Sequence, residues 1–160
     1  MMQPIVFYTQ MFEDNSKKCM ERSKKKLLVL FEGLVSCNLI HLHDFPDTPK
    51  LYDSGVVYQP EFDTEEWQDI PTTLERGFGD CEDLAAYRCA ELRFEGIPAK
   101  PWIRWRNVGG SWRFHALVAW PDYRDSNGRL VKGRVEDPSR RLGMAKWSGY
   151  LSATPQSQQF

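Results

Sequence analysis

The hydrophobic residues of this chain change their spacing near Pro98, and this change constrains the fold more than any other feature. Before Pro98, apolar residues recur every three or four positions, as on one face of an amphipathic helix. After Pro98, apolar and polar residues alternate with a period of two, as in half-buried strands. Helices followed by consecutive strands predict an α+β domain with an antiparallel meander.

Two long helices are predicted in the first part. One spans about residues 15–42, with an apolar stripe at Leu27, Phe31, Leu34, Val35, Leu39 and Leu42. The other spans 82–94, follows a glycine-rich entry at 77–81, and is closed by Gly96 and Pro98. A short strand at 56–58 and one helical turn at 71–75 are expected between them.

Three strands are predicted in the second part, at 102–106, 112–120 and 130–136. Gly109-Gly110 and Asn127-Gly128 supply the turns between them. The central helix is expected to pack on this sheet, with a shared core of Leu84, Ala85, Leu92, Ile103, Leu117 and Val118.

The chain length of 160 residues predicts one domain, over about 1–151, followed by a flexible polar tail at 152–160. The net charge is -1, from 21 basic and 22 acidic residues, which gives no indication of a nucleic-acid partner. The longest aliphatic-aromatic run is five residues, Leu27 to Phe31, so no membrane partner is expected either. The start of the chain lacks the pattern of a signal peptide, which favours reduced thiols and argues against secretion.

Among the four cysteines, Cys81 differs from Cys19, Cys37 and Cys89, which are explained as core or helix residues. Cys81 lies where the central helix begins, after a Gly-x-Gly turn. Free backbone N–H groups and the helix dipole there favour a thiolate and can hold an oxyanion. The alternative is a helix-start cysteine without a chemical role.

A nucleophilic cysteine needs a base and an orienting acceptor. His115 lies in the middle of a predicted strand, and Asp137 lies at the end of the next strand. With the hairpin centred near residue 126, positions 115 and 137 are expected about opposite each other.

No metal or other cofactor is expected. Cys37, His41, His43 and Asp44 are the one set with ligand side chains close in sequence, but His43 would lie on a different side of the helix from the other ligands.

Four segments resemble the core of the transglutaminase-like superfamily: GDCEDLA at 79–85, GIPA at 96–99, FHALV at 114–118 and EDP at 136–138. The resemblance covers about 65–145 and implies a papain-like fold. Segments at 47–49, 51–56 and 137–144 are similar to small transglutaminase-like proteins of tailed bacteriophages, which extends the resemblance over most of 27–145.

The resemblance implies roles for three residues: Cys81 as nucleophile, His115 as general base and acid, and Asp137 as the orienting carboxylate. Trp67 and Gln68 are candidates for the oxyanion hole, although aromatic packing and a polar loop residue are the simpler explanation of the two.

The expected function is a cysteine-dependent protease or amidase acting through an acyl-enzyme on a protein or peptide substrate. The alternatives are transglutaminase-type acyl transfer, or a non-catalytic phage virion or assembly component that binds phage structural proteins. The resemblance implies a location in the host cytoplasm or in a virion.

Overall fold

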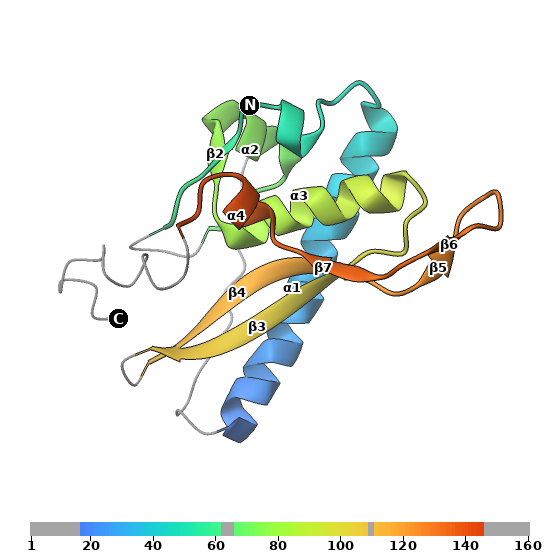
Figure 1. Ribbon diagram of the computed structural model, residues 1–160. Helices are drawn as coiled ribbons and strands as arrows, with labels where there is room; N and C mark the ends of the chain where they lie inside the picture. The colour runs from blue at the N-terminus through green and yellow to red at the C-terminus, as the bar shows by residue number, and fades with distance from the viewer. Residues whose placement is uncertain (1–16, 62–65, 109–110, 146–160) are drawn as a thin grey trace.

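The computed structural model describes residues 17–61, 66–108 and 111–145. It has an α+β architecture, in agreement with the fold class predicted from the sequence (Figure 1). The elements in chain order are α1 (Lys17–Asp44), η1 (Leu51–Asp53), β1 (Val57–Tyr58), α2 (Ile70–Arg76), β2 (Phe78–Gly79), α3 (Cys81–Phe94), β3 (Lys100–Val108), β4 (Ser111–Trp120), β5 (Tyr123–Arg124), β6 (Leu130–Val131), β7 (Arg134–Glu136) and α4 (Pro138–Arg141).

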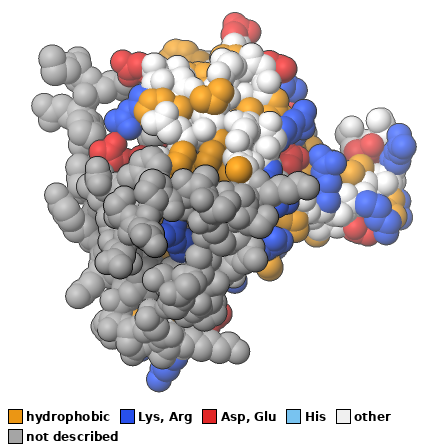
Figure 2. All heavy atoms as spheres, turned by 60° about the vertical axis from the view of Figure 1, so that its left-hand side comes forward, with side chains coloured by type: hydrophobic (Ala, Val, Ile, Leu, Met, Phe, Trp, Pro, Cys, Tyr) orange, Lys and Arg blue, Asp and Glu red, His pale blue; other side chains and the backbone are white. Residues whose placement is uncertain are grey.

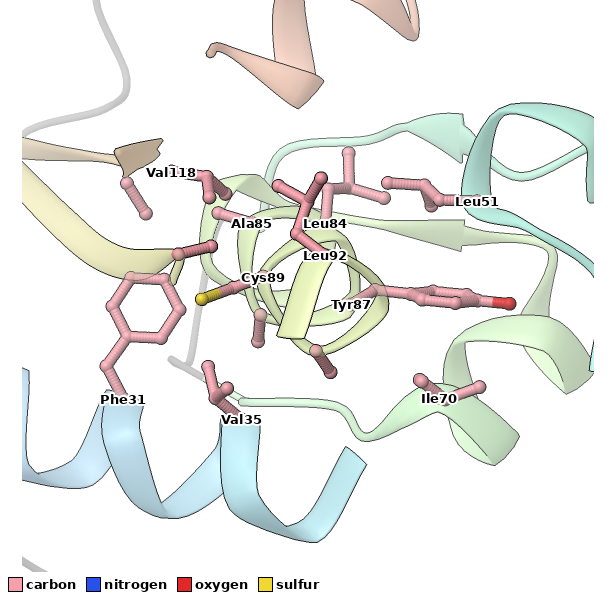
Figure 3. Close-up of a cluster of buried hydrophobic side chains, with 14 of the residues drawn as sticks. Phe31, Val35, Leu51, Ile70, Leu84, Ala85, Tyr87, Cys89, Leu92 and Val118 are labelled. Atoms are coloured by element: carbon pink, nitrogen blue, oxygen red, sulfur yellow. The ribbon is translucent and has the colours of Figure 1, made fainter. Parts of the chain in front are cut away.

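Helix α3 is the centre of the core. Figure 3 looks along this helix and shows core side chains from α1, η1, α2 and β4 all around it. Most of its own residues are buried, including Leu84, Ala85 and Leu92 as predicted. The buried residues of α3 include the acidic Glu82, Asp83 and Glu91, so its position inside the domain follows from packing on several sides and not from an apolar surface alone.

Helix α1 packs on α3 through the stripe seen in the sequence. Phe31 and Val35 are fully buried, and Arg93 of α3 donates two hydrogen bonds, of 2.8 and 3.0 Å, to the carboxylate of Glu32. By length and composition alone, Lys18–Asp44 would also suffice to cross a membrane: an 18-residue window within it has a mean hydropathy of 1.3, and 28% of that window is buried. Core helices of soluble proteins and signal sequences pass the same test, and here the buried stripe of the helix packs on α3.

The main sheet has the order β3-β4-β7 and is antiparallel throughout. A separate two-stranded parallel pair, β1-β2, lies beside the start of α3. The β5-β6 hairpin extends away from the body of the domain in Figure 1. Charged side chains gather on this projection in Figure 2, where Lys132 pairs with Asp122 at 2.8 Å.

The predicted strand at 130–136 is wrong as one continuous strand, because it is divided into β6 and β7. At the division, Gly133 lies so close to the backbone at Trp120 and Pro121 that an added Cβ would lie 2.6 Å from both. Pro121 has no N–H to donate to a strand partner. The backbone N–H of Gly133 donates to the side chain of Asp122, at a distance of 2.7 Å from its Oδ1. The predicted Gly109-Gly110 turn and the tail at 152–160 lie outside the described residues.

Candidate active site

Cys81 is the first residue of α3, as the sequence predicts. Asp80 is the N-cap: its side chain accepts from the backbone of Glu82 at 3.1 Å and of Asp83 at 3.5 Å. The Asp83 side chain accepts in return from Asp80 N at 3.1 Å. This reciprocal capping satisfies backbone donors that the helix leaves unpaired, and it fixes the turn that carries Cys81.

The glycines before Cys81 have specific structural roles beyond local flexibility. Gly77 ends α2 with a φ of 75°, a left-handed conformation that side chains rarely adopt. Gly79 lies against the capping pair, and a Cβ there would lie 2.9 Å from the Cβ of Asp83. Both glycines therefore let the chain turn tightly into α3.

His115 and Asp137 meet at the edge of the sheet. His115 lies on β4 and is only 8% exposed, and its Nε2 is 2.9 Å from Asp137 Oδ2. Asp137 follows β7 and caps α4, with Oδ1 accepting from Arg140 N at 3.2 Å. Burial raises the pKa of Asp137, but the His115 hydrogen bond and charge together with the Arg140 contacts outweigh burial and lower the pKa below its ordinary value. Asp137 is thus a stable carboxylate partner for the imidazole.

The strand register differs by two residues from the predicted one. Val118 pairs with Glu136, so His115 is not directly opposite Asp137 in the ladder. The pair still forms because Asp137 lies just beyond the last paired residue of β7 and caps α4, and its side chain reaches His115.

The thiol of Cys81 lies beside the same strand. Its Sγ accepts a hydrogen bond from the backbone N–H of Ala116, the residue after His115, at 3.4 Å. It also donates to Glu82 Oε2 at 2.8 Å. The structure therefore brings the start of α3 to the part of β4 that carries His115. Cys81 itself is half-buried.

The electrostatic setting of Cys81 is opposite to the sequence-based expectation of a lowered pKa. Burial raises the pKa of the Cys81 thiol well above its usual range, and the carboxylates of Glu82 and Asp80 raise it further. The Ala116 hydrogen bond lowers it and only partly compensates. The helix-dipole argument was incomplete, because it left out the acidic side chains next to the thiol. The setting of Cys81 therefore favours the protonated form of the thiol.

Trp67 and Gln68 lie on the segment that enters α2. The backbone N–H of Gln68 donates to Asp83 Oδ1 at 2.7 Å, which ties this segment to the first turn of α3. The Gln68 side chain is buried, and its amide has no hydrogen-bond partner among the described residues. Trp67 packs edge-on against Phe31 with ring centroids 5.8 Å apart, which agrees with the simpler explanation of aromatic packing.

Sequence reasoning missed two acidic residues near the three candidate catalytic side chains. Glu82 is 2% exposed, and its carboxylate accepts a hydrogen bond from the Cys81 thiol. Its position directly after Cys81 was the available signal. Glu136 precedes Asp137 and receives a hydrogen bond from Arg88 Nε at 2.9 Å. No sequence pattern linked Glu136 to Arg88, which is 48 residues away.

No group of three or more metal-ligating side chains occurs within residues 17–61, 66–108 and 111–145. His41, considered above as a ligand, has its Nε2 3.1 Å from the hydroxyl of Thr48.

No curated protein and no solved structure matches the chain. The family model of the transglutaminase-like superfamily matches residues 50–130. This range spans half of the chain and includes Cys81 and His115, whereas Asp137 lies just beyond it. The fold, the order of the elements and this match together show that the chain belongs to the transglutaminase-like superfamily.

Proposed function

We propose that this protein is a cysteine-dependent hydrolase of peptide or amide bonds that acts through an acyl-enzyme. Two hydrogen bonds support the proposal: the one from Ala116 N to Cys81 Sγ, which brings the thiol to the residue after His115, and the one between His115 and Asp137. Nucleophile, base and orienting group are the three parts that thiol catalysis requires.

In the first step, a ring nitrogen of His115 accepts the thiol proton as the sulfur of Cys81 attacks the substrate carbonyl carbon. Asp137 bonds Nε2, so Nδ1 is the nitrogen assigned to this transfer. Asp137 stabilises the imidazolium that forms, in the way an orienting carboxylate does in catalytic triads. The tetrahedral intermediate then expels the amine, which takes the proton from His115, and a thioester remains on Cys81.

In the second step, water attacks the thioester and gives its proton to His115. The carboxylic acid product leaves, and the sulfur regains its proton. A primary amine in place of water would give acyl transfer, which is the alternative reaction. The two reactions share every step until the acceptor enters.

Because the thiol donates to Glu82, the attack requires the Sγ–H to leave Glu82 and turn toward His115. The N–H groups of Glu82 and Asp83 are bound to Asp80, so we assign the oxyanion to the backbone N–H of Cys81, with supporting roles for Trp67 and Gln68. The buried, unpartnered amide of Gln68 supports this assignment more strongly than the packed indole of Trp67.

The finer parts of the proposal rest on sequence resemblance. A protein or peptide substrate rests on the resemblance to the superfamily, and a location in the host cytoplasm or in a virion rests on the resemblance to phage proteins. A non-catalytic virion or assembly component is the competing proposal from another class, and it is supported by the Cys81–Glu82 hydrogen bond and the raised pKa of the thiol.

Wild-type protein, Cys81→Ser and Cys37→Ser are incubated with a peptide library from a bacterial proteome, with and without dansylcadaverine as a primary amine. Cys37 is exposed and lies on α1, so its variant is the matched control. We expect new carboxyl termini with wild type and Cys37→Ser and none with Cys81→Ser. Dansylated glutamine without new termini would favour acyl transfer over hydrolysis. Equal products from wild type and Cys81→Ser, or no products from either, would favour the non-catalytic component.

A further inference from the structure

A buried ionic cluster lies next to the candidate triad; we call it the Glu136 cluster, and it comprises Tyr52, Arg88, Glu91 and Glu136. Arg88 donates through Nε to Glu136 at 2.9 Å and through a terminal nitrogen to Glu91 at 3.0 Å. The Tyr52 hydroxyl donates to the same oxygen of Glu136. The exposed fractions of these side chains are 15% for Arg88, 5% for Glu91 and 10% for Glu136.

Burying such a cluster adds little net stability to a fold. Removing charges from water costs several kcal/mol for each ion, and apolar side chains of similar size often do as well or better. In some proteins, buried ionic groups fix one arrangement of the elements that they join. The Glu136 cluster joins η1, α3 and β7.

The two ends of this link are next to the candidate catalytic residues. Arg88 lies seven positions after Cys81 on α3, which is two helical turns and therefore the same side of the helix. Glu136 is the last residue of β7, and Asp137 follows it directly. Consecutive residues in extended backbone direct their side chains to opposite sides, so Glu136 can bond Arg88 while Asp137 bonds His115.

The strand β7 has few other restraints. It is three residues long, and it lies at the edge of the sheet and pairs only with β4 within the described residues. Burial raises the pKa of Glu136, but hydrogen bonds and charge from Tyr52 and Arg88 lower it below its ordinary value overall. Glu136 is therefore an ionised partner for the Arg88 guanidinium.

We propose that Arg88 is a positioning residue, which holds Glu136, and through it the end of β7, so that Asp137 stays on His115. The proposal rests on the proposed catalysis for its functional meaning. Its structural part concerns the His115–Asp137 hydrogen bond, which can be measured without turnover.

The test follows the downfield proton resonance of the imidazole N–H that bonds Asp137, assigned by its loss in Asp137→Asn. The variants are Arg88→Met and Arg88→Lys, with Arg134→Met as the matched control. Arg134 also donates to Glu136, at 3.1 Å, but it is 62% exposed and lies on β7 itself, so it does not tie β7 to α3.

We expect Arg88→Met to lose the resonance and, where turnover is measurable, to lower kcat at least tenfold with a smaller change in KM. Arg134→Met should keep the resonance and stay within about twofold of wild type. Arg88→Lys keeps the charge but lacks the planar fork that reaches two carboxylates, so it should fold and show a broadened or weakened resonance.

A folded Arg88→Met that keeps the resonance would overturn the proposal. If Arg88→Met does not fold, an unchanged resonance in Arg88→Lys would overturn it instead. Absence of turnover in wild type would count against the proposed function, while the resonance would still decide the role of Arg88.

Discussion

Replacing Glu82 with Gln should lower the pKa of the Cys81 thiol. In the structure the thiol donates to Glu82 Oε2 at 2.8 Å, and Glu82 is 2% exposed. The carboxylate stabilises the protonated thiol by accepting a hydrogen bond from it, and it would repel a thiolate at the same distance. Glutamine keeps the size of the side chain and removes the negative charge.

The size of the change follows from the hydrogen bond. A hydrogen bond to a charged group contributes about 1.5–3 kcal/mol, and one pKa unit corresponds to about 1.4 kcal/mol. The Cys81 pKa should therefore fall by about one to two units in Glu82→Gln.

The assay is the pH dependence of iodoacetamide alkylation at each cysteine, followed by peptide mass spectrometry. Thiolate becomes about tenfold more abundant for each unit that the pKa falls, but its nucleophilicity falls with a Brønsted coefficient of about 0.4–0.5. Near neutral pH, Cys81 in Glu82→Gln should thus react about three- to tenfold faster than in wild type. In wild type, the exposed Cys37 should react faster than Cys81, the reverse of what a helix-start thiolate would give.

Two controls make the result specific. Glu21→Gln changes an exposed carboxylate on α1 and should leave the Cys81 curve in place. Cys89 is buried and burial raises its pKa to about 12, so it should stay unreacted in every folded sample. If the alkylation curve of Cys81 is unchanged in folded Glu82→Gln, or moves to higher pH, the assignment of Glu82 as acceptor of the hydrogen bond from the thiol is refuted.

Three further predictions concern stability. Gly79→Ala places a Cβ 2.9 Å from the Asp83 Cβ and should destabilise the fold by about 1–3 kcal/mol in urea unfolding. Gly33→Ala, where nothing lies within 4 Å of the added Cβ, should be neutral or stabilising, and equal effects of the two variants would contradict this contrast. Burial raises the Asp83 pKa to about 8, above its unfolded value of about 3.9, so the stability that Asp83 contributes is present below about pH 4 and is lost as the pH rises through 8. Asp83→Asn should flatten this pH dependence of the unfolding free energy, and a variant curve parallel to that of wild type would show that another group is responsible. Phe31→Ala should cost about 3–5 kcal/mol because Phe31 is fully buried, while Val29→Ala, at a side chain that is 73% exposed, should stay within about 0.5 kcal/mol; a small loss for Phe31 would place the α1 contact outside the core.

Local patterns were enough to predict most of the elements. The stripe on α1 and the alternation after Pro98 reflect how helices and strands bury one side, so they are readable wherever the core lies. The strand at 130–136 was predicted as continuous because the period of two was extended across Gly133. Its division at Gly133 depends on how closely the Pro121 backbone approaches, and no periodicity carries that information.

The candidate site divides in the same way. The sequence by itself determined that Cys81 begins a capped helix, that His115 lies inside a strand, and that Asp137 follows the next strand, because these are properties of local backbone structure. Only the tertiary structure decided the direction in which the pKa of the thiol is shifted and the link between Arg88 and Glu136. Both depend on burial and on contacts between side chains, and for Arg88 and Glu136 the partners are 48 residues apart, so their energies are set by packing that no local pattern encodes.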